Sequence, residues 1–459
     1  MLSRRRLFQS SLAFRGSLSL AAALLLSLVA QASHAFCGFY VAGGESKLYN
    51  HKSQVALVRD GDHTVMTLAS DYEGDPREFA LVVPVPVVLQ RGQIHVADST
   101  LVGQLDAFSA PRLVEYFDES PCAGERRDLM GISVNSSAVR SMGGSVAKLM
   151  ELESVHIEAR YEVDEYDVLI LSADDSGALL SWLRRNGYRV PESASRVVQS
   201  YLSQGMKFFV AKVDLRRRAA RGLTQLRPLQ IAYDSPRFML PVRLGMTNAN
   251  GPQELFVYAV TRTGRVEAVN YRNVRVPEEV DVPFYVKQDA ASVWRSAFDQ
   301  QVAKHGMGVV FTEYAWNMAW CDPCPTQPLS PAQLRELGVW WLDEPNAQTF
   351  LTRLHARYDR ASFPEDLVLQ TTADQVNFQS RLVVRHEWSG PAECAAVNTY
   401  RRSLPARRER QARALTELTG WPLERVRASM GLDANWLADG EDLAPFKPKA
   451  WWEKLWAKQ

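Results

Sequence analysis

QVALVRDGDHTVMTL, residues 54–68, holds two β-rich runs separated by a short polar turn. The runs are Gln54–Arg59 and His63–Leu68, and both are dominated by apolar and β-branched residues. Asp60-Gly61-Asp62 lies between them, and an Asp-Gly pair supplies the positive φ that a tight hairpin turn needs. The segment therefore predicts a β-hairpin, and with it a fold that contains antiparallel sheet.

On either side of the hairpin the pattern changes from strands to helices and back. Phe79–Leu89 is strongly apolar but contains Pro84 and Pro86, which predicts an edge strand or an extended segment because proline cannot donate to a sheet. Further along, Tyr166–Leu171 and Lys207–Val213 read as strands with two helical stripes between them. This strand–helix–helix–strand order suits a crossover unit that covers one face of a sheet.

The remaining elements complete a mixed architecture. Further strands are predicted at Leu229–Tyr233, Phe238–Leu244, Leu255–Arg262, Arg265–Val276, Val309–Tyr314, Leu367–Thr371 and Phe378–His386. Helices are predicted at Ser99–Phe117 with a break at Pro111, at Ala290–Lys304 with Gly306 as the stop, and at Pro331–Trp341. The sequence thus predicts an α+β fold with mixed, largely antiparallel sheets, packed helices and a helical C-terminal appendage.

The composition changes along the chain and predicts a division into three segments. Residues 1–35 read as a signal peptide, residues 36–395 as an α+β core of one or two subdomains, and residues 396–459 as a helical appendage and tail. The appendage is arginine-rich and helical over about Thr399–Gly431. The tail carries Trp451, Trp452 and Trp456, which indicates a peripheral contact with a membrane surface.

The N-terminus has the order of a secretory signal peptide. A positive region at Arg4, Arg5 and Arg6 precedes an apolar stretch over Leu18–Ala30, and Ser33-His34-Ala35 follows with small residues suited to cleavage after Ala35. The arginine run fits either the Sec or the Tat pathway. The protein is therefore expected in the periplasm or outside the cell. No second apolar run approaches the length of a membrane span.

Composition and motifs exclude several classes of protein. The formal net charge is +1, which argues against a nucleic-acid partner. Hydrophobic content of 46% and charged content of 23% are those of an ordinary globular protein. The sequence holds no phosphate-binding loop, dinucleotide fingerprint, hydrolase nucleophile elbow or zinc-protease helix. No catalytic residue, cofactor or metal ligand is therefore assigned.

Cysteine chemistry is expected to be architectural. The five cysteines are Cys37, Cys122, Cys321, Cys324 and Cys394. In an oxidising compartment the first four are disulfide candidates, and one thiol is left over. Cys37 and Cys122 are expected to tie the N-terminal strand to the loop after Glu119, which would stabilise the fold by about 3 kcal/mol.

Trp320-Cys321-Asp322-Pro323-Cys324 is the sharpest motif in the chain, because it resembles a thioredoxin-like redox site. The prolines after Cys324 disfavour the helix whose dipole would activate the first thiol, and Asp322 disfavours a thiolate. A crosslink that pins a proline-rich loop is therefore the preferred reading. The redox pair Cys321 and Cys324 stays as an alternative. A zinc site that combines them with two of His305, His355, His386 and Cys394 is the weakest reading.

Several segments resemble a bacterial family known as domain of unknown function 2330. They are Cys37–Val41, Glu78–Pro86, Ser109–Tyr116, Gly205–Ala211, Trp320–Cys324 and Phe363–Leu367. The similarity extends over about Phe36 to His386, and it implies an exported protein with no assigned activity or catalytic residues. Some members of the family end in a membrane-spanning helix, and this chain does not.

Two functional hypotheses follow. The first is a non-enzymatic binding or structural protein of the cell envelope, whose ligand or partner the sequence does not identify. The alternative is a thiol–disulfide oxidoreductase that uses Cys321 as nucleophile and Cys324 as resolving thiol. Aromatic residues near this motif would line a ligand groove or pack in the core, and core packing is preferred for Tyr314, Trp316, Trp320, Trp340 and Trp341.

Overall fold

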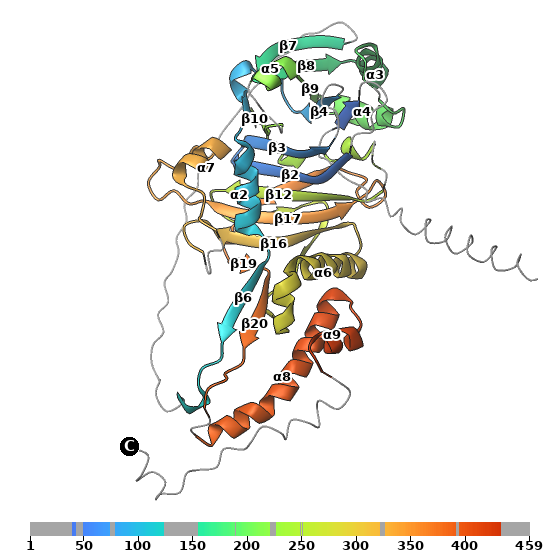
Figure 1. Ribbon diagram of the computed structural model, residues 1–459. Coiled ribbons are helices and arrows are strands. Elements are labelled where there is room, and N and C mark those ends of the chain that lie inside the picture. The colour runs from blue at the N-terminus through green and yellow to red at the C-terminus, as the bar shows by residue number, and fades with distance from the viewer. Residues whose placement is uncertain are drawn as a thin grey trace, which may run out of the picture.

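The computed structural model describes most of the chain between its two ends. The described residues are 39–42, 49–73, 79–123, 155–188, 190–220, 226–247, 249, 251–321, 326–391 and 394–432. Within them a five-stranded and a nine-stranded sheet lie against each other, and helices pack on both (Figure 1). A smaller unit of strands and helices lies beyond the nine-stranded sheet (Figure 1). The predicted α+β class is confirmed.

The nine-stranded sheet is mixed and contains the predicted hairpin. Its order is β14 (Arg272–Arg275), β16 (Val309–Asn317), β17 (Phe350–Tyr358), β12 (Gln253–Thr261), β2 (Tyr49–Asp60), β3 (His63–Glu73), β10 (Leu229–Asp234) and β5 (Ile94–Val96), with β19 (Phe378–Gln379) beside β16. The hairpin β2–β3 turns at Gly61, whose φ of 56° is a conformation that favours glycine. Only the β12–β2 and β14–β16 pairs of this sheet run parallel among the described strands.

The five-stranded sheet is antiparallel throughout its described pairs. Its order is β1 (Phe39–Ala42), β4 (Phe79–Val85), β9 (Lys207–Val213), β8 (Tyr166–Ala173) and β7 (Val155–Val163). The prediction of an edge strand at Phe79–Leu89 is wrong, because β4 lies between β1 and β9. The described part of β1 pairs with β4 only up to Val82, so Pro84 has a described partner strand, β9, on one side only. Proline is tolerated in a strand where one side is left unpaired.

The prediction of a crossover unit is confirmed for its helices and wrong for its strand pairing. Helices α3 (Ser176–Arg185) and α4 (Ala194–Leu202) do cover the outer face of the five-stranded sheet. The strands that flank them, β8 and β9, pair antiparallel instead of parallel. Two consecutive helices reverse the chain twice, so the next strand starts from the end at which the first one finished. A single crossover helix would have given a parallel pair.

Apolar side chains separate into layers as strand alternation requires. One core lies between the two sheets and includes Val55, Leu57, Val168 and Phe209. The opposite face of the nine-stranded sheet is covered by α2 (Ser99–Ser109) and α7 (Pro331–Leu337) together with the fully buried Trp341. The same face, towards β16 and β17, is covered by α6 (Ala290–His305), which ends at Gly306 as predicted.

The C-terminal helices are packed into a third unit. The strands β15 (Val280–Val282), β20 (Arg381–His386) and β6 (Arg112–Phe117) form a parallel sheet. One face of it shares a core with α6, α8 (Ala396–Thr419) and α9 (Leu423–Ser429). The predicted helical appendage is confirmed: α8 and α9 follow the strands at the C-terminal end of the described chain (Figure 1). Its apolar side chains are buried against α6 and the parallel sheet.

Several boundaries differ from the prediction. The helix predicted at Ser99–Phe117 ends before Pro111 and continues as strand β6, and Phe238–Leu244 contains only the short strand β11 (Met239–Leu240). The segment Arg265–Val276 divides into β13 (Val266–Ala268) and β14, and β13 pairs with β18 (Leu367–Thr371). A short helix α5 (Leu215–Ala220) follows β9. Strands β5, β7, β15 and β17 were not predicted.

The predicted pairing of Cys37 with Cys122 is wrong. Cys122 forms a disulfide with Cys394, and the two Cα atoms lie 5.8 Å apart. The pairing follows from the sheet, because β6 and β20 run parallel with Phe117 opposite His386. The chain therefore leaves both strands at the same end, and the next cysteine on each segment meets the other.

Two predicted features fall outside the described residues. These are the signal peptide at residues 1–35 and the tryptophan tail at Trp451, Trp452 and Trp456. Among the helices that the structure describes, none combines the length and the hydropathy needed for a transmembrane segment.

Candidate functional site

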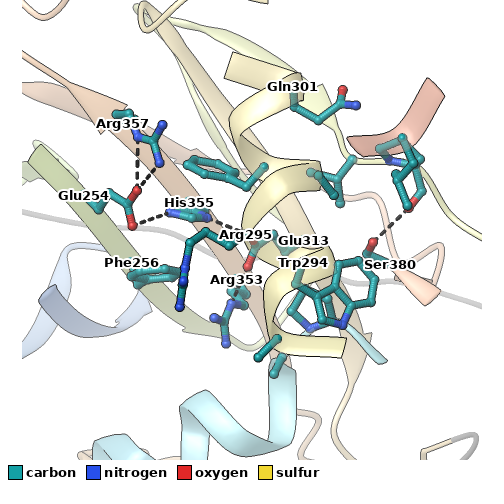
Figure 2. A pocket seen from close by; sticks show the side chains of 18 residues that line it. Glu254, Phe256, Trp294, Arg295, Gln301, Glu313, Arg353, His355, Arg357 and Ser380 are labelled. Carbon is teal, nitrogen blue, oxygen red and sulfur yellow. Dashed lines mark hydrogen bonds and ion pairs between the residues drawn. The ribbon is translucent and has the colours of Figure 1, made fainter. Parts of the chain in front are cut away.

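A cavity of about 420 Å³ lies between α6 and the nine-stranded sheet (Figure 2). This volume is within the range of roughly 300–1,000 Å³ that is typical of small-molecule sites. The cavity is lined by Ala110, Pro111, Glu254, Phe256, Val276, Pro277, Ala291, Trp294, Arg295, Ala297, Phe298, Gln301, Glu313, Arg353, His355, Arg357, Ser380 and Leu418. Apolar side chains form much of this lining, and the charged ones come mainly from the sheet.

Strand alternation places these charges on one face. On β17, Arg353, His355 and Arg357 face the cavity, whereas Leu354 and Ala356 between them enter the core between the sheets. The register of β12 puts Glu254 opposite Arg357 and Phe256 opposite His355. Side chains directly opposite each other on neighbouring strands lie within contact distance. The pairing of β12 with β17 therefore places Glu254 beside Arg357, and the Phe256 ring beside His355.

A β-bulge supplies the central carboxylate. In the β16–β17 register, Thr312 faces Leu354 and Tyr314 faces Arg353, so Glu313 is the extra residue between them. A bulge adds a residue to one strand and redirects its side chain, and such irregularities are common at functional sites. Here it brings the Glu313 carboxylate between His355 and Arg353 (Figure 2).

His355 is held on every side. Only 5% of the residue is exposed. Its Nδ1 donates to Glu313 Oε1 at 2.7 Å, and its ring stacks on Phe298 and Phe256 with centroids 3.5 Å and 3.9 Å away. Its Nε2 lies 3.6 Å from Glu254 Oε2, which is within ion-pair distance but too far for a hydrogen bond. The ring orientation is thus fixed, and Nε2 has no hydrogen-bond partner.

The two arginines of β17 are each bound by two acids. Arg353 donates from Nε to Glu313 at 2.6 Å and from Nη1 to the Asp106 carboxylate at 2.7 Å. Arg357 pairs with Glu254 and, at 2.8 Å, with Asp299 on α6. The network therefore joins the sheet to α2 through Asp106 and to α6 through Asp299, on both sides of the cavity.

The charges of this network alter the pKa values of its carboxyl groups. Burial alone would raise the pKa of Glu313, but the charges of His355 and Arg353 outweigh it and lower the pKa to about 2. Burial is likewise outweighed at Glu254, where His355 and Arg357 lower the pKa to about 2. The pKa of Arg353 is raised, because Glu313 and its other partners outweigh the effect of burial. Both glutamates are consequently ionised at neutral pH.

Acid is expected to weaken the fold through these two glutamates. Their folded pKa of about 2 lies below the ordinary value of 4.5, so the stability they give is complete above 4.5 and is lost as the pH falls towards 2. For the buried Glu313 the difference corresponds to about 3 kcal/mol at neutral pH. We expect denaturant titrations between about pH 6 and pH 3 to show a smaller loss of stability in Glu313→Gln than in the native chain. An identical loss in both would contradict the network, and the exposed Glu192→Gln is the control.

The hydroxyl group of this lining is bonded to the backbone. Ser380 carries the only hydroxyl group among the lining residues, and its Oγ donates to the Pro277 carbonyl at 2.8 Å. A nucleophile would need a base within hydrogen-bond reach, and Ser380 is engaged elsewhere. What the cavity offers instead is fixed charge, aromatic surface and a set of polar groups on α6.

The cysteine motif lies apart from this cavity. Cys321 follows β16 and is disulfide-bonded, and among the residues described after it, from 326 onward, the first helix is α7 at Pro331. Cys37 and Cys324 lie outside the described residues, so the redox pair stays a prediction. Two of the residues considered as zinc ligands are engaged elsewhere, because Cys394 is bonded to Cys122 and His355 belongs to the ion network.

The aromatic group near that motif is divided between core and surface. Tyr314, Trp316 and Trp341 are buried in the core beneath α2 and α7, as expected. Trp320 and Trp340 are 51% and 42% exposed, so core packing was wrong for these two. The predicted aromatics line no part of the cavity, whereas Trp294 on α6 does.

The ion network was not predicted from the sequence. Residues Phe350–Tyr358 alternate polar and apolar side chains from Arg353 onward, which is the signature of a strand with one polar face. That pattern would have placed Arg353, His355 and Arg357 together.

One comparison with known proteins gives a match. A family model described as an uncharacterized protein conserved in bacteria (DUF2330) matches residues 31–370. The matched range contains all residues of the ion network and α6, and it ends before Ser380 and Leu418. No curated protein and no solved structure matches the chain.

Proposed function

Because the chain belongs to DUF2330, a family described as an uncharacterized protein conserved in bacteria, we propose a function from the geometry of the chain itself. The protein is a small-molecule-binding protein of the cell envelope, and the cavity beneath α6 is its binding site.

One observation carries this proposal: a cavity of ligand size is built on charged groups that are already fixed. His355, Arg353 and Glu313 are each at least nine-tenths buried, and Glu313 is hydrogen-bonded to both of the others. Burying such a network gives little net stability compared with apolar residues of the same shape. The presence of this buried network is more readily explained by ligand binding, since charged groups that are fixed beforehand lower the entropic cost of binding a ligand.

The envelope part of the proposal rests on two other features. The N-terminal order of Arg4–Arg6, an apolar stretch and Ser33-His34-Ala35 is that of a secretory signal. The disulfide between Cys122 and Cys394 is of the kind that persists in oxidising compartments. Together they support a protein that works in the periplasm or outside the cell.

Blocking the cavity at its mouth tests the proposed function. Ala291 is an exposed lining residue, so tryptophan there should fill the entrance without disturbing the core. We expect Ala291→Trp to weaken the binding of a naphthalene probe at least about 10-fold, which is about 1.4 kcal/mol in isothermal titration. Ala303→Trp is the matched control, because Ala303 is exposed on the same helix and does not line the cavity.

Two results would contradict the proposal. The first is that the native protein binds no naphthalene derivative, whether anionic, neutral or cationic. The second is that Ala291→Trp and Ala303→Trp bind the probe equally well, because binding would then take place elsewhere.

A further inference from the structure

Several polar groups of the cavity have no partner. Within the described residues, the side chains of Trp294, Arg295 and Gln301 make no hydrogen bond or ion pair. Gln301 is 7% exposed, and His355 Nε2 is buried without a hydrogen-bond partner. A guanidinium and an indole N–H only donate, whereas an amide both donates and accepts. The unmatched capacity of this site is therefore mainly that of donors.

The acids around the cavity are already occupied. Glu313 accepts from His355 and Arg353, and Glu254 is bound to Arg357. Asp106 is bound to Arg353 and accepts from Tyr258, while Asp299 is bound to Arg357. None of these carboxylates lies within ion-pair distance of Arg295. Arg295 is thus the lining cation that has no acidic partner in the described part of the chain (Figure 2).

Helix geometry arranges the donors along one side of the cavity. Trp294, Phe298 and Gln301 are spaced four and three residues apart, so they share the face of α6 that is turned to the sheet. Arg295 is adjacent to Trp294, and Gln301 lies six residues further on, about 9 Å along the helix axis. Figure 2 shows Gln301 well separated from Arg295 along α6. Along the helix Phe298 lies between the two polar ends, and Trp294 lies next to Arg295 at one of them.

From these observations, and resting on the proposed function, we propose that the ligand is an organic carboxylate with an apolar body. Its anionic head binds the Arg295 guanidinium, and its body packs on Trp294 and Phe298 and against Leu418 from α8. A charge-assisted hydrogen bond is about twice as strong as a neutral one, which gives the site its preference for an anion. A cationic ligand would meet Arg295 unfavourably and would find every nearby carboxylate already bonded.

Three probes that differ only in the head group test this assignment. They are naphthalene-2-carboxylate, naphthalene-2-carboxamide and 2-naphthylmethylamine, each titrated into the native protein. We expect the carboxylate to bind at least about 10-fold more tightly than the amide, since hydrogen bonds to charged groups contribute about 1.5–3 kcal/mol. We expect the amine to bind most weakly.

The variant Arg295→Gln should remove the preference for the carboxylate while the amide still binds. Lys304→Gln is the control, because Lys304 is an exposed cation on the same helix outside the cavity. Should the amide bind as tightly as the carboxylate while Ala291→Trp still blocks both, the anion assignment is wrong and the binding function stands. Absence of binding by all three probes would overturn the proposed function instead. Equal effects of Arg295→Gln and Lys304→Gln would also contradict the assignment, because a general loss of charge would explain them.

Discussion

Replacing Arg353 by methionine is expected to lower the free energy of unfolding by about 3–5 kcal/mol, which is the usual cost of removing one partner from a buried ion pair. Arg353 is 5% exposed and is bonded to Glu313 and Asp106. Methionine keeps much of the volume of the side chain. The loss therefore comes from leaving the Glu313 carboxylate buried with His355 as its remaining partner.

The matched control is the same substitution at an exposed pair. Arg335 on α7 is bonded to Asp343, and their side chains are 50% and 77% exposed. Exposed pairs contribute roughly 0–1 kcal/mol, so Arg335→Met should change the stability by no more than that. Guanidinium titrations of both variants give the comparison. Equal, small losses would mean that the charges around Arg353 are solvated and that the network is not as described.

A second substitution separates the cost of the unpaired charge from the loss of contacts. Glu313→Gln removes the carboxylate that Arg353→Met leaves behind. We expect the double variant to lose less stability than the sum of the two single variants, because the partners are in direct contact. Strict additivity would show that Glu313 and Arg353 do not act as a pair.

The elements of the fold that depend on a few neighbouring residues could be predicted from the sequence. The β2–β3 hairpin depends on Gly61 and its flanking residues, and α6 ends at Gly306 for reasons visible in sequence. The position of β4 within its sheet was not visible, because its neighbours β1 and β9 come from distant parts of the chain. The antiparallel pairing of β8 with β9 likewise depends on how α3 and α4 pack.

In the candidate site, too, some features follow from neighbouring residues and others depend on distant parts of the chain. The alternation in β17 was present in the sequence and would have predicted a polar face with Arg353, His355 and Arg357. The place of Glu313 could not be predicted, because a bulge is a property of the register between two strands. Which helix covers that face, and therefore the position of Arg295 in the cavity lining, depends on tertiary packing. The sequence thus contained the charges of the site but not their arrangement.

The pairing of β6 with β20 also explains the Cys122–Cys394 disulfide. Removing this disulfide is expected to cause a second large loss of stability. The two cysteines are 272 residues apart in the chain. Closing so long a loop restricts the unfolded state strongly, and removal of a native disulfide typically costs about 2–4 kcal/mol. The bond joins the segment after β6 to the start of α8, and α8 supplies Leu418 to the cavity wall.

We expect Cys394→Ser, Cys122→Ser and the double variant to lose the same stability, since each removes the same single crosslink. Under a reductant that opens this bond, the native chain should fall towards the stability of the variants, while the variants change less. The comparison uses protein recovered from the cell envelope, where the bond should be formed, and protein made in a reducing cytoplasm, where it should be absent. Reduced Cys122 and Cys394 in envelope protein would contradict both the crosslink and the proposed location. Stability that is unchanged in the double variant would show that the packing of α8 on α6 and β15 holds this unit in place without the bond.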